Sequence, residues 1–142
     1  MTVGVTPRRL KIFFDGGCRP NPGRIEVAVF ARGIAYFGDD CGEGSNGDAE
    51  WLALIAALQI AHALSDGPFD LIGDARFVID RANGTYPCRT PEVQAHRDHF
   101  LKLAAPRPPA RIRWIGRAQN LAGIALEQRR GGVLTSPAAP LP

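Results

Sequence analysis

The chain of 142 residues is 45% hydrophobic, which suits one compact domain with a single core. Its net charge of +3, from 17 Lys and Arg against 14 Asp and Glu, excludes a polycationic tail and favours a polyanionic partner. Three cysteines without CxxC spacing indicate neither a disulfide framework nor a zinc site, and no apolar run approaches the ~20 residues of a membrane span. We therefore expect a reduced, cytoplasmic protein that binds no membrane.

The two ends of the chain differ in composition from its middle. Residues 1–9 predict a flexible N-terminus. Residues 131–142 predict a disordered tail, because two glycines are followed by a stretch rich in Pro, Ala and Ser that cannot bury a core face. We therefore expect the folded domain to comprise residues 10–130.

The domain opens with three predicted strands. Residues 10–15 (LKIFFD) are a short apolar run that ends at Gly16-Gly17, as a strand before a tight turn does. Residues 25–31 and 34–38 are two further apolar runs separated by Arg32-Gly33, which predicts a hairpin.

Helices and strands then alternate. The Ala- and Leu-rich residues 49–64 contain no Gly or Pro and predict a helix. The later elements are a strand over 69–74, a short helix after Asp74, a helix capped by Thr90 and ending before Pro106, a strand over 110–116 and a helix over 119–130. The order βββαβααβα predicts an α/β fold with a mixed sheet flanked by helices.

Asp15 and Asp74 each end a predicted apolar strand. Open α/β sheets place their ligands at the carboxyl ends of such strands, so both carboxylates are candidate ligand groups. A turn residue or a helix cap is the alternative for each, and for Asp74 the cap is an equally good interpretation.

Glu50 lies in the first turn of the predicted long helix. At 100° per residue, the polar Gln59, His62 and Asp66 fall about 120–180° away from it, so Glu50 faces the sheet with the apolar residues. A buried carboxylate there requires a partner, and the charged groups able to meet it are other carboxylates, which indicates a bound cation. The alternative is that Glu50 only complements the helix dipole.

Four segments carry a resemblance to a known family. They are DGGCRPNPG at 15–23, SNGDAEWLALIAAL at 45–58, GDARFVID at 73–80 and RWIGRAQNLAG at 113–123. In this order they resemble type 1 ribonuclease H, in its short archaeal-like form, over roughly residues 10–130. The resemblance implies a ribonuclease H-like fold with a five-stranded mixed sheet.

It also implies an activity and a site. The activity is endonucleolytic cleavage of the RNA strand of an RNA/DNA hybrid with two Mg²⁺ or Mn²⁺ ions, one activating water and one stabilising the leaving oxygen. Asp15, Glu50 and Asp74 would be the catalytic metal ligands. The substrate-binding groups would be Gly16, Gly17, Cys18, Asn21 and Asn46, which read ribose 2′-hydroxyls, and Arg117, which reaches a phosphate. Ordinary turn chemistry for the asparagines and an exposed loop position for Arg117 remain open.

The sequence departs from the family at the last helix. Where the family carries a fourth carboxylate, this chain has Gly123, which implies reduced or altered activity. Glu127 lies one turn further on and is either a replacement or a solvated residue near Arg130. Two other functions therefore stay open: a catalytically impaired module that binds nucleic acid, and a nuclease of the same fold with another nucleic-acid substrate. In each case we expect a monomer.

Overall fold

The computed structural model describes residues 8–142 and has one mixed sheet of seven strands in the order β6-β5-β1-β2-β3-β7, with β4 paired to β2. Antiparallel pairing joins β1 to β2, β2 to β3 and β2 to β4, whereas β5 is parallel to β1 and β6, and β7 is parallel to β3. The strands are β1 (Leu10–Cys18), β2 (Gly23–Ala31), β3 (Ile34–Gly38), β4 (Glu43–Gly44), β5 (Phe69–Gly73), β6 (Arg111–Trp114) and β7 (Ala138–Pro140).

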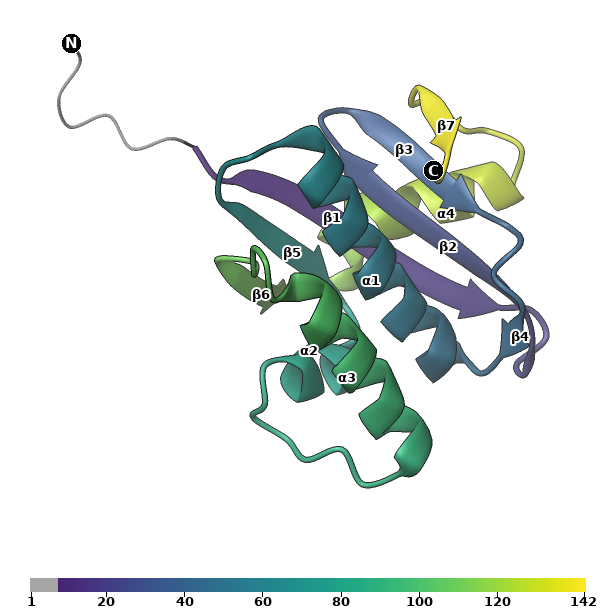
Figure 1. Cartoon of the computed structure of the whole chain (residues 1–142). Helices are drawn as coiled ribbons and strands as arrows, with labels where there is room; N and C mark the ends of the chain where they lie inside the picture. Colours follow the sequence, from purple (N-terminus) through teal and green to yellow (C-terminus); the bar gives the residue numbers. More distant parts are fainter. Residues whose placement is uncertain (1–7) are drawn as a thin grey trace, which may run out of the picture.

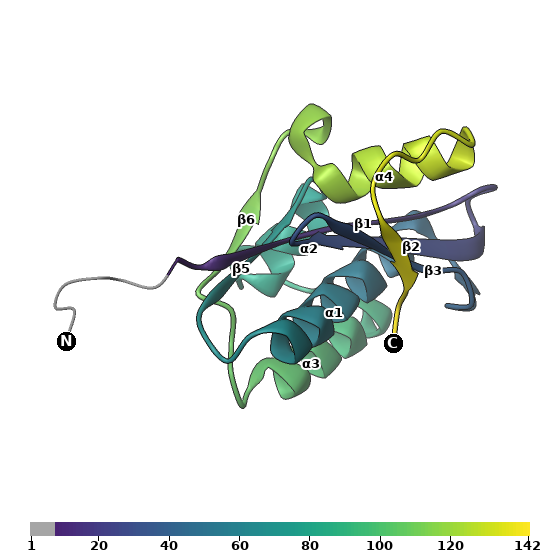
Figure 2. The same cartoon turned by 90° about the horizontal axis from the view of Figure 1, so that it is seen from above.

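Helices cover both faces of this sheet. In Figures 1 and 2, α1 and α3 lie on one face and α4 lies on the other. The helices are α1 (Asn46–Leu64), α2 (Arg76–Ala82), α3 (Pro91–Ala104), the 3-10 turn η1 (Arg117–Gln119) and α4 (Leu121–Arg130). Within residues 8–142 the structure contains no helix with the length and apolarity needed to cross a membrane.

The alternation of side chains along β1 divides the core into two parts. Ile12 and Phe14 are fully buried against α1 in the larger cluster, while Phe13 points to the opposite face and packs beside α4. Asp15 follows Phe13 by two positions and therefore lies on the α4 face of the sheet.

The predicted fold class is confirmed, and the elements follow the predicted order. Several boundaries differ, and the two largest shifts, of three residues each, have a clear cause. Helix α1 begins three residues earlier, because the Ser45 hydroxyl accepts a hydrogen bond from the Asp48 N–H (3.1 Å) and the Asp48 carboxylate accepts one from the Ser45 N–H (3.0 Å). Strand β1 continues through the predicted turn at Gly16-Gly17 to Cys18, because those residues pair with β2.

The sheet has seven strands instead of five, and the prediction of a disordered tail is wrong for part of residues 131–142. Residues 138–140 form β7, and the N–H of Leu141 donates to the carbonyl of Phe37 at 2.9 Å. The outer edge of β3 has backbone N–H and C=O groups that need hydrogen-bond partners, and residues 138–140 supply them. The segment does so although it is apolar and rich in proline. Of the predicted flexible N-terminus, residues 1–7 lie outside the described part of the chain.

Candidate active site

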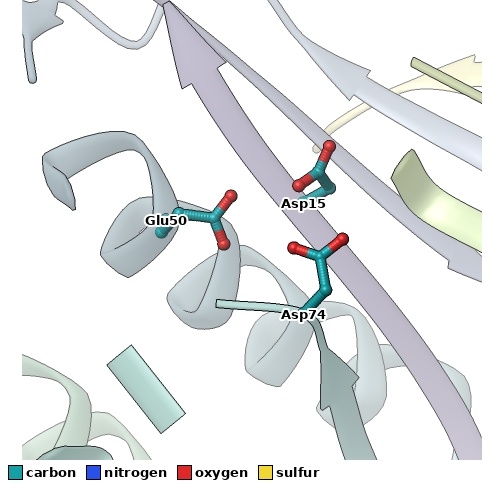
Figure 3. A group of neighbouring side chains, drawn as sticks. All are labelled: Asp15, Glu50 and Asp74. Carbon is teal, nitrogen blue, oxygen red and sulfur yellow. The ribbon is translucent and has the colours of Figure 1, made fainter. Parts of the chain in front are cut away.

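Three carboxylates converge at the carboxyl ends of the central strands. Asp15 lies late in β1, Asp74 directly follows β5, which is the parallel neighbour of β1, and Glu50 lies in the first turn of α1. One oxygen from each lies within 4.8 Å of the others, and Figure 3 shows the three groups facing one another. The prediction that these acids lie together is therefore confirmed as geometry.

Asp74 is not the cap of the helix that follows it. The N-cap of α2 is Ala75, and no side chain bonds there. The Asp74 carboxylate instead accepts a hydrogen bond from the Nδ2 of Asn120 at 3.3 Å. The buried Asn120 also donates to the Phe14 carbonyl at 3.0 Å and caps α4, so one side chain ties Asp74, β1 and the last helix together.

Asn120 did not stand out in the sequence as a site residue. The available signal was an Asn directly before a helical segment, which predicts a cap and nothing more. Its contact with Asp74, 46 residues away, depends on the fold.

Glu50 is 9% exposed, and only one of its two carboxylate oxygens accepts a hydrogen bond. Its Oε1 accepts the N–H of Gly16 at 2.9 Å, whereas its Oε2 is buried without a hydrogen-bond partner among residues 8–142. Helix α1 can approach β1 this closely because residue 16 is glycine, since a Cβ there would overlap the carbonyl of Ala49. The dipole interpretation of Glu50 leaves its inward orientation unexplained.

Burial and mutual repulsion disfavour ionisation of this cluster. Burial raises the pKa of Glu50 well above its ordinary value, and the charge of Asp15 adds to the rise. Burial also raises the pKa of Asp15, with a further contribution from Asp74, while the positive charges of Arg117 and Arg130 oppose it. Negative charge on these carboxylates therefore destabilises the folded chain.

The donor set fits a hard divalent cation. All three groups offer carboxylate oxygens, which Mg²⁺ and Mn²⁺ prefer, and the buried Oε2 of Glu50 lacks a protein partner within the described chain. A cation between the carboxylates would remove their repulsion and satisfy that oxygen.

The residues predicted to bind substrate separate into two groups. A hollow of about 290 Å³ contains the three acids and is lined also by Gly16, Gly17, Cys18, Arg19, Asn46, Arg117 and Arg130. Asn21 does not line it. Its Oδ1 accepts the N–H of Asn46 (3.1 Å), and the Oδ1 of Asn46 accepts the N–H of Cys18 (3.0 Å). Both amide oxygens thus brace the β1–β2 turn against α1, which supports the turn-chemistry alternative for those atoms.

Helix α4 brings Gly123 to the site and keeps Glu127 out of it. A Cβ at Gly123 would lie 3.4 Å from Oδ2 of Asp15. Glu127 is 55% exposed and its Oε1 pairs with Arg19 and with Arg130, each at 2.9 Å. The hydrogen bond from Arg130 is the main cause of its lowered pKa. The structure therefore favours the solvated interpretation of Glu127.

Comparisons with known proteins agree with this architecture. The model of the reverse transcriptase-like family matches residues 15–129. Ribonuclease HI of Halobacterium salinarum is 32% identical over 123 residues, which make up 83% of this chain and 62% of that protein. The chain thus spans less than two thirds of that relative.

Two solved structures have the same fold. The crystal structure of RNase H1 from Halobacterium salinarum NRC-1 matches with a TM-score of 0.76 at 26% identity, over 88% of this chain and 99% of that one. LC11-RNase H1 from compost, in complex with an RNA/DNA hybrid, matches with a TM-score of 0.68 at 23% identity, over 80% of this chain and 89% of that one. Because the family model matches most of the chain and includes all three acids, the chain belongs to the reverse transcriptase-like family and has the type 1 ribonuclease H fold.

Proposed function

We propose that this protein is a divalent-metal-dependent endonuclease that cleaves the RNA strand of RNA/DNA hybrids. The observation that carries the proposal is the convergence of Asp15, Glu50 and Asp74, with one buried oxygen of Glu50 unpartnered within the described chain. Three converging acids that form no ion pair within residues 8–142 are expensive to keep in a fold unless a metal ion binds there.

The relatives support the substrate class. The Halobacterium salinarum relative is named Ribonuclease HI, and LC11-RNase H1 was solved with an RNA/DNA hybrid bound. In this chain the amide NH₂ groups of Asn21 and Asn46 make no hydrogen bond within the described residues and would be available to ribose hydroxyls.

The residues of the site have distinct tasks in this proposal. Asp15, Glu50 and Asp74 would hold Mg²⁺ or Mn²⁺, and the bound metal would supply an activated water and charge stabilisation at the phosphate. The Gly16 N–H fixes the orientation of Glu50, and Asn120 fixes that of Asp74. Arg117 at the rim of the hollow would contact a phosphate of the substrate.

One observation favours an impaired module that binds nucleic acid without cutting it. Gly123 leaves the α4 side of Asp15 without a fourth carboxylate. Retention of three converging acids favours the enzyme, because binding alone gives no reason to bury repelling charges.

Cleavage assays separate these functions. We expect the protein to cut RNA/DNA hybrid, and neither double-stranded RNA nor double-stranded DNA, when Mg²⁺ or Mn²⁺ is present and to cut nothing in EDTA. Binding of hybrid without cleavage under either metal would support the impaired module, and cleavage of another duplex in preference to hybrid would support a different substrate.

All three carboxylates come from one chain, so a monomer suffices for this activity. The three free thiols, Cys18, Cys41 and Cys88, fit a reducing cytoplasmic setting.

A further inference from the structure

A second hollow lies on the α4 face of the sheet, at the end of β1 away from Asp15. Its volume is about 970 Å³, and we call it the basic groove. Its cationic lining residues are Arg8, Arg9, Lys11, Arg32, Arg111 and Arg113, its one carboxylate is Asp70, and its apolar residues include Phe13, Phe30 and Leu121.

The pairing of strands places several of these side chains in two rows. Arg111 on β6, Asp70 on β5 and Lys11 on β1 are aligned neighbours. The second row lies two residues further along the strands. It runs across four strands, from Arg113 on β6 through Ile72 on β5 and Phe13 on β1 to Phe30 on β2. Aligned residues of adjacent strands face the same side, so the sheet presents a cationic row next to a partly aromatic row.

Helix α4 does not close this surface. It begins at Leu121, which lines the groove and is 38% exposed, and it packs on β1, β2 and β3. Figure 2 shows α4 above β2 and β3, away from the start of β1. Phe13 and Phe30 are therefore only partly buried.

The charge of the molecule is concentrated here. Six cationic side chains and one carboxylate give the groove a formal charge of +5, more than the +3 of the whole chain. Residues 1–7, which precede the groove in sequence, contain no acidic side chain to offset it. The basic groove is therefore the surface where the excess positive charge of the chain could attract a polyanion.

Asp70 organises two of the arginines without neutralising the surface. It is 2% exposed, and its carboxylate lies 3.3 Å from Nε of Arg9 and 3.6 Å from Nε of Arg113. Lys11 and Arg111 are exposed and form no ion pair within the described chain. Their charges remain available to a ligand.

We propose that the basic groove is a binding site for single-stranded nucleic acid, distinct from the acidic site and beyond the proposed cleavage of hybrids. A duplex offers phosphates but keeps the faces of its bases stacked inside, so Phe13 and Phe30 would find no partner on it. A single strand offers both phosphates for the cationic row and base faces for the aromatic residues. Cationic side chains next to aromatic side chains therefore favour a single strand over a duplex.

The test is fluorescence anisotropy with a fluorescein-labelled dT 12-mer in EDTA, where no cleavage occurs. The variant Lys11→Ala/Arg111→Ala removes two exposed charges of the groove, and Arg24→Ala/Arg89→Ala removes two exposed charges elsewhere as a matched control. We expect binding at least fivefold weaker for the groove variant and within twofold of the parent for the control. The slope of log Kd against log salt should fall by about 1.4 for the groove variant.

The role of the aromatic side chains is tested separately with Phe30→Leu, which keeps an apolar side chain and removes the ring face. We expect this variant to bind the dT 12-mer at least fivefold more weakly while staying folded, with a thermal midpoint lowered by no more than about 5 °C, since Phe30 also packs against the cluster beside α4. A blunt DNA duplex should bind more weakly than the single strand.

Several outcomes would overturn the proposal. They are equal losses in the groove and control variants, parent-like binding by Phe30→Leu, and displacement of the dT 12-mer by polyglutamate at equal charge, which would identify an acidic protein segment as the occupant. Because binding is measured in EDTA, failure of the cleavage proposal leaves these results unaffected. The groove variant should also cut blunt hybrid at the parent rate if the hybrid proposal holds.

Discussion

Glu50 passes from water in the unfolded chain to a buried position beside two other carboxylates in the folded one. Its pKa is therefore raised on folding, mainly by burial. For an acid with a raised folded pKa, the favourable contribution to stability is complete below the unfolded pKa of about 4.3 and is lost as the pH rises through the folded value. At neutral pH the ionised site opposes folding.

Glu50→Gln should therefore stabilise the metal-free protein at pH 8. The amide imitates the protonated acid, because its oxygen can still accept the N–H of Gly16 while its NH₂ can donate to Asp15. We expect a gain on the order of 1–3 kcal/mol at pH 8 that shrinks towards zero near pH 4. Urea unfolding in EDTA at the two pH values measures it, and a gain independent of pH would contradict the assigned cause.

Asp15→Asn should remove cleavage and leave binding intact. Asp15 is the member of the cluster on β1, and its loss removes a metal ligand without touching the groups that would contact phosphate and ribose. We expect hybrid cleavage to fall roughly 100-fold or more, with hybrid affinity close to the parent value. Parent-like cleavage by Asp15→Asn would refute the metal site.

At the scale of elements, α4 is held over the sheet near both of its ends. The helix is anchored at its start by Asn120 and paired near its end through Arg129 and Arg130 with Glu26 on β2. Between these anchors, Gly123 faces Asp15 and Glu127 faces Arg19. The helix therefore presents no carboxylate to the metal ligands.

Gly123→Asp should raise hybrid cleavage several-fold, most visibly with Mg²⁺. The added Cβ meets Asp15 at ordinary contact distance, and replacing an interior helical glycine does not weaken the helix. A fourth carboxylate would help to hold a second ion, and Mg²⁺ tolerates imperfect coordination poorly. Initial rates under Mg²⁺ and Mn²⁺ measure the effect, and the parent should prefer Mn²⁺. Without metal, the variant should unfold at lower temperature than the parent, because the new charge repels Asp15.

Glu127→Gln supplies the complementary measurement. Since Glu127 pairs with Arg19 and Arg130 outside the acidic cluster, we expect the parent's cleavage rate to change less than threefold under either metal. A sharp loss would show that Glu127 moves into the site and stands in for the missing acid.

At the scale of the whole molecule, the acidic site and the last strand lie apart in the sheet. The acids lie on β1, on α1 and after β5, whereas β7 is an edge strand, with β2 and β3 between it and β1. Removal of residues 137–142 should therefore lower the free energy of unfolding by about 1–2 kcal/mol, from the lost pairing and the half-buried Leu141, without changing the cleavage rate. Urea unfolding together with a cleavage assay tests both parts, and an unchanged free energy of unfolding would mean that β7 contributes nothing in solution.

The sequence by itself determined the features that depend on neighbouring residues. The apolar run before Asp15 predicts a strand, the helical phase of Glu50 predicts its inward direction, and the element order predicts a mixed sheet. These signals repeat every two to four residues, so a single chain displays them without knowledge of its partners. Their agreement with one another located the acidic site.

Only the tertiary structure decided the interactions between distant segments. It assigned Asp74 to Asn120 instead of a helix cap, paired Glu127 with Arg19, and joined residues 138–140 to β3. It also aligned cations from β1 and β6 into one groove. Each of these depends on which elements become neighbours when the core packs, and no local periodicity of a sequence encodes that choice.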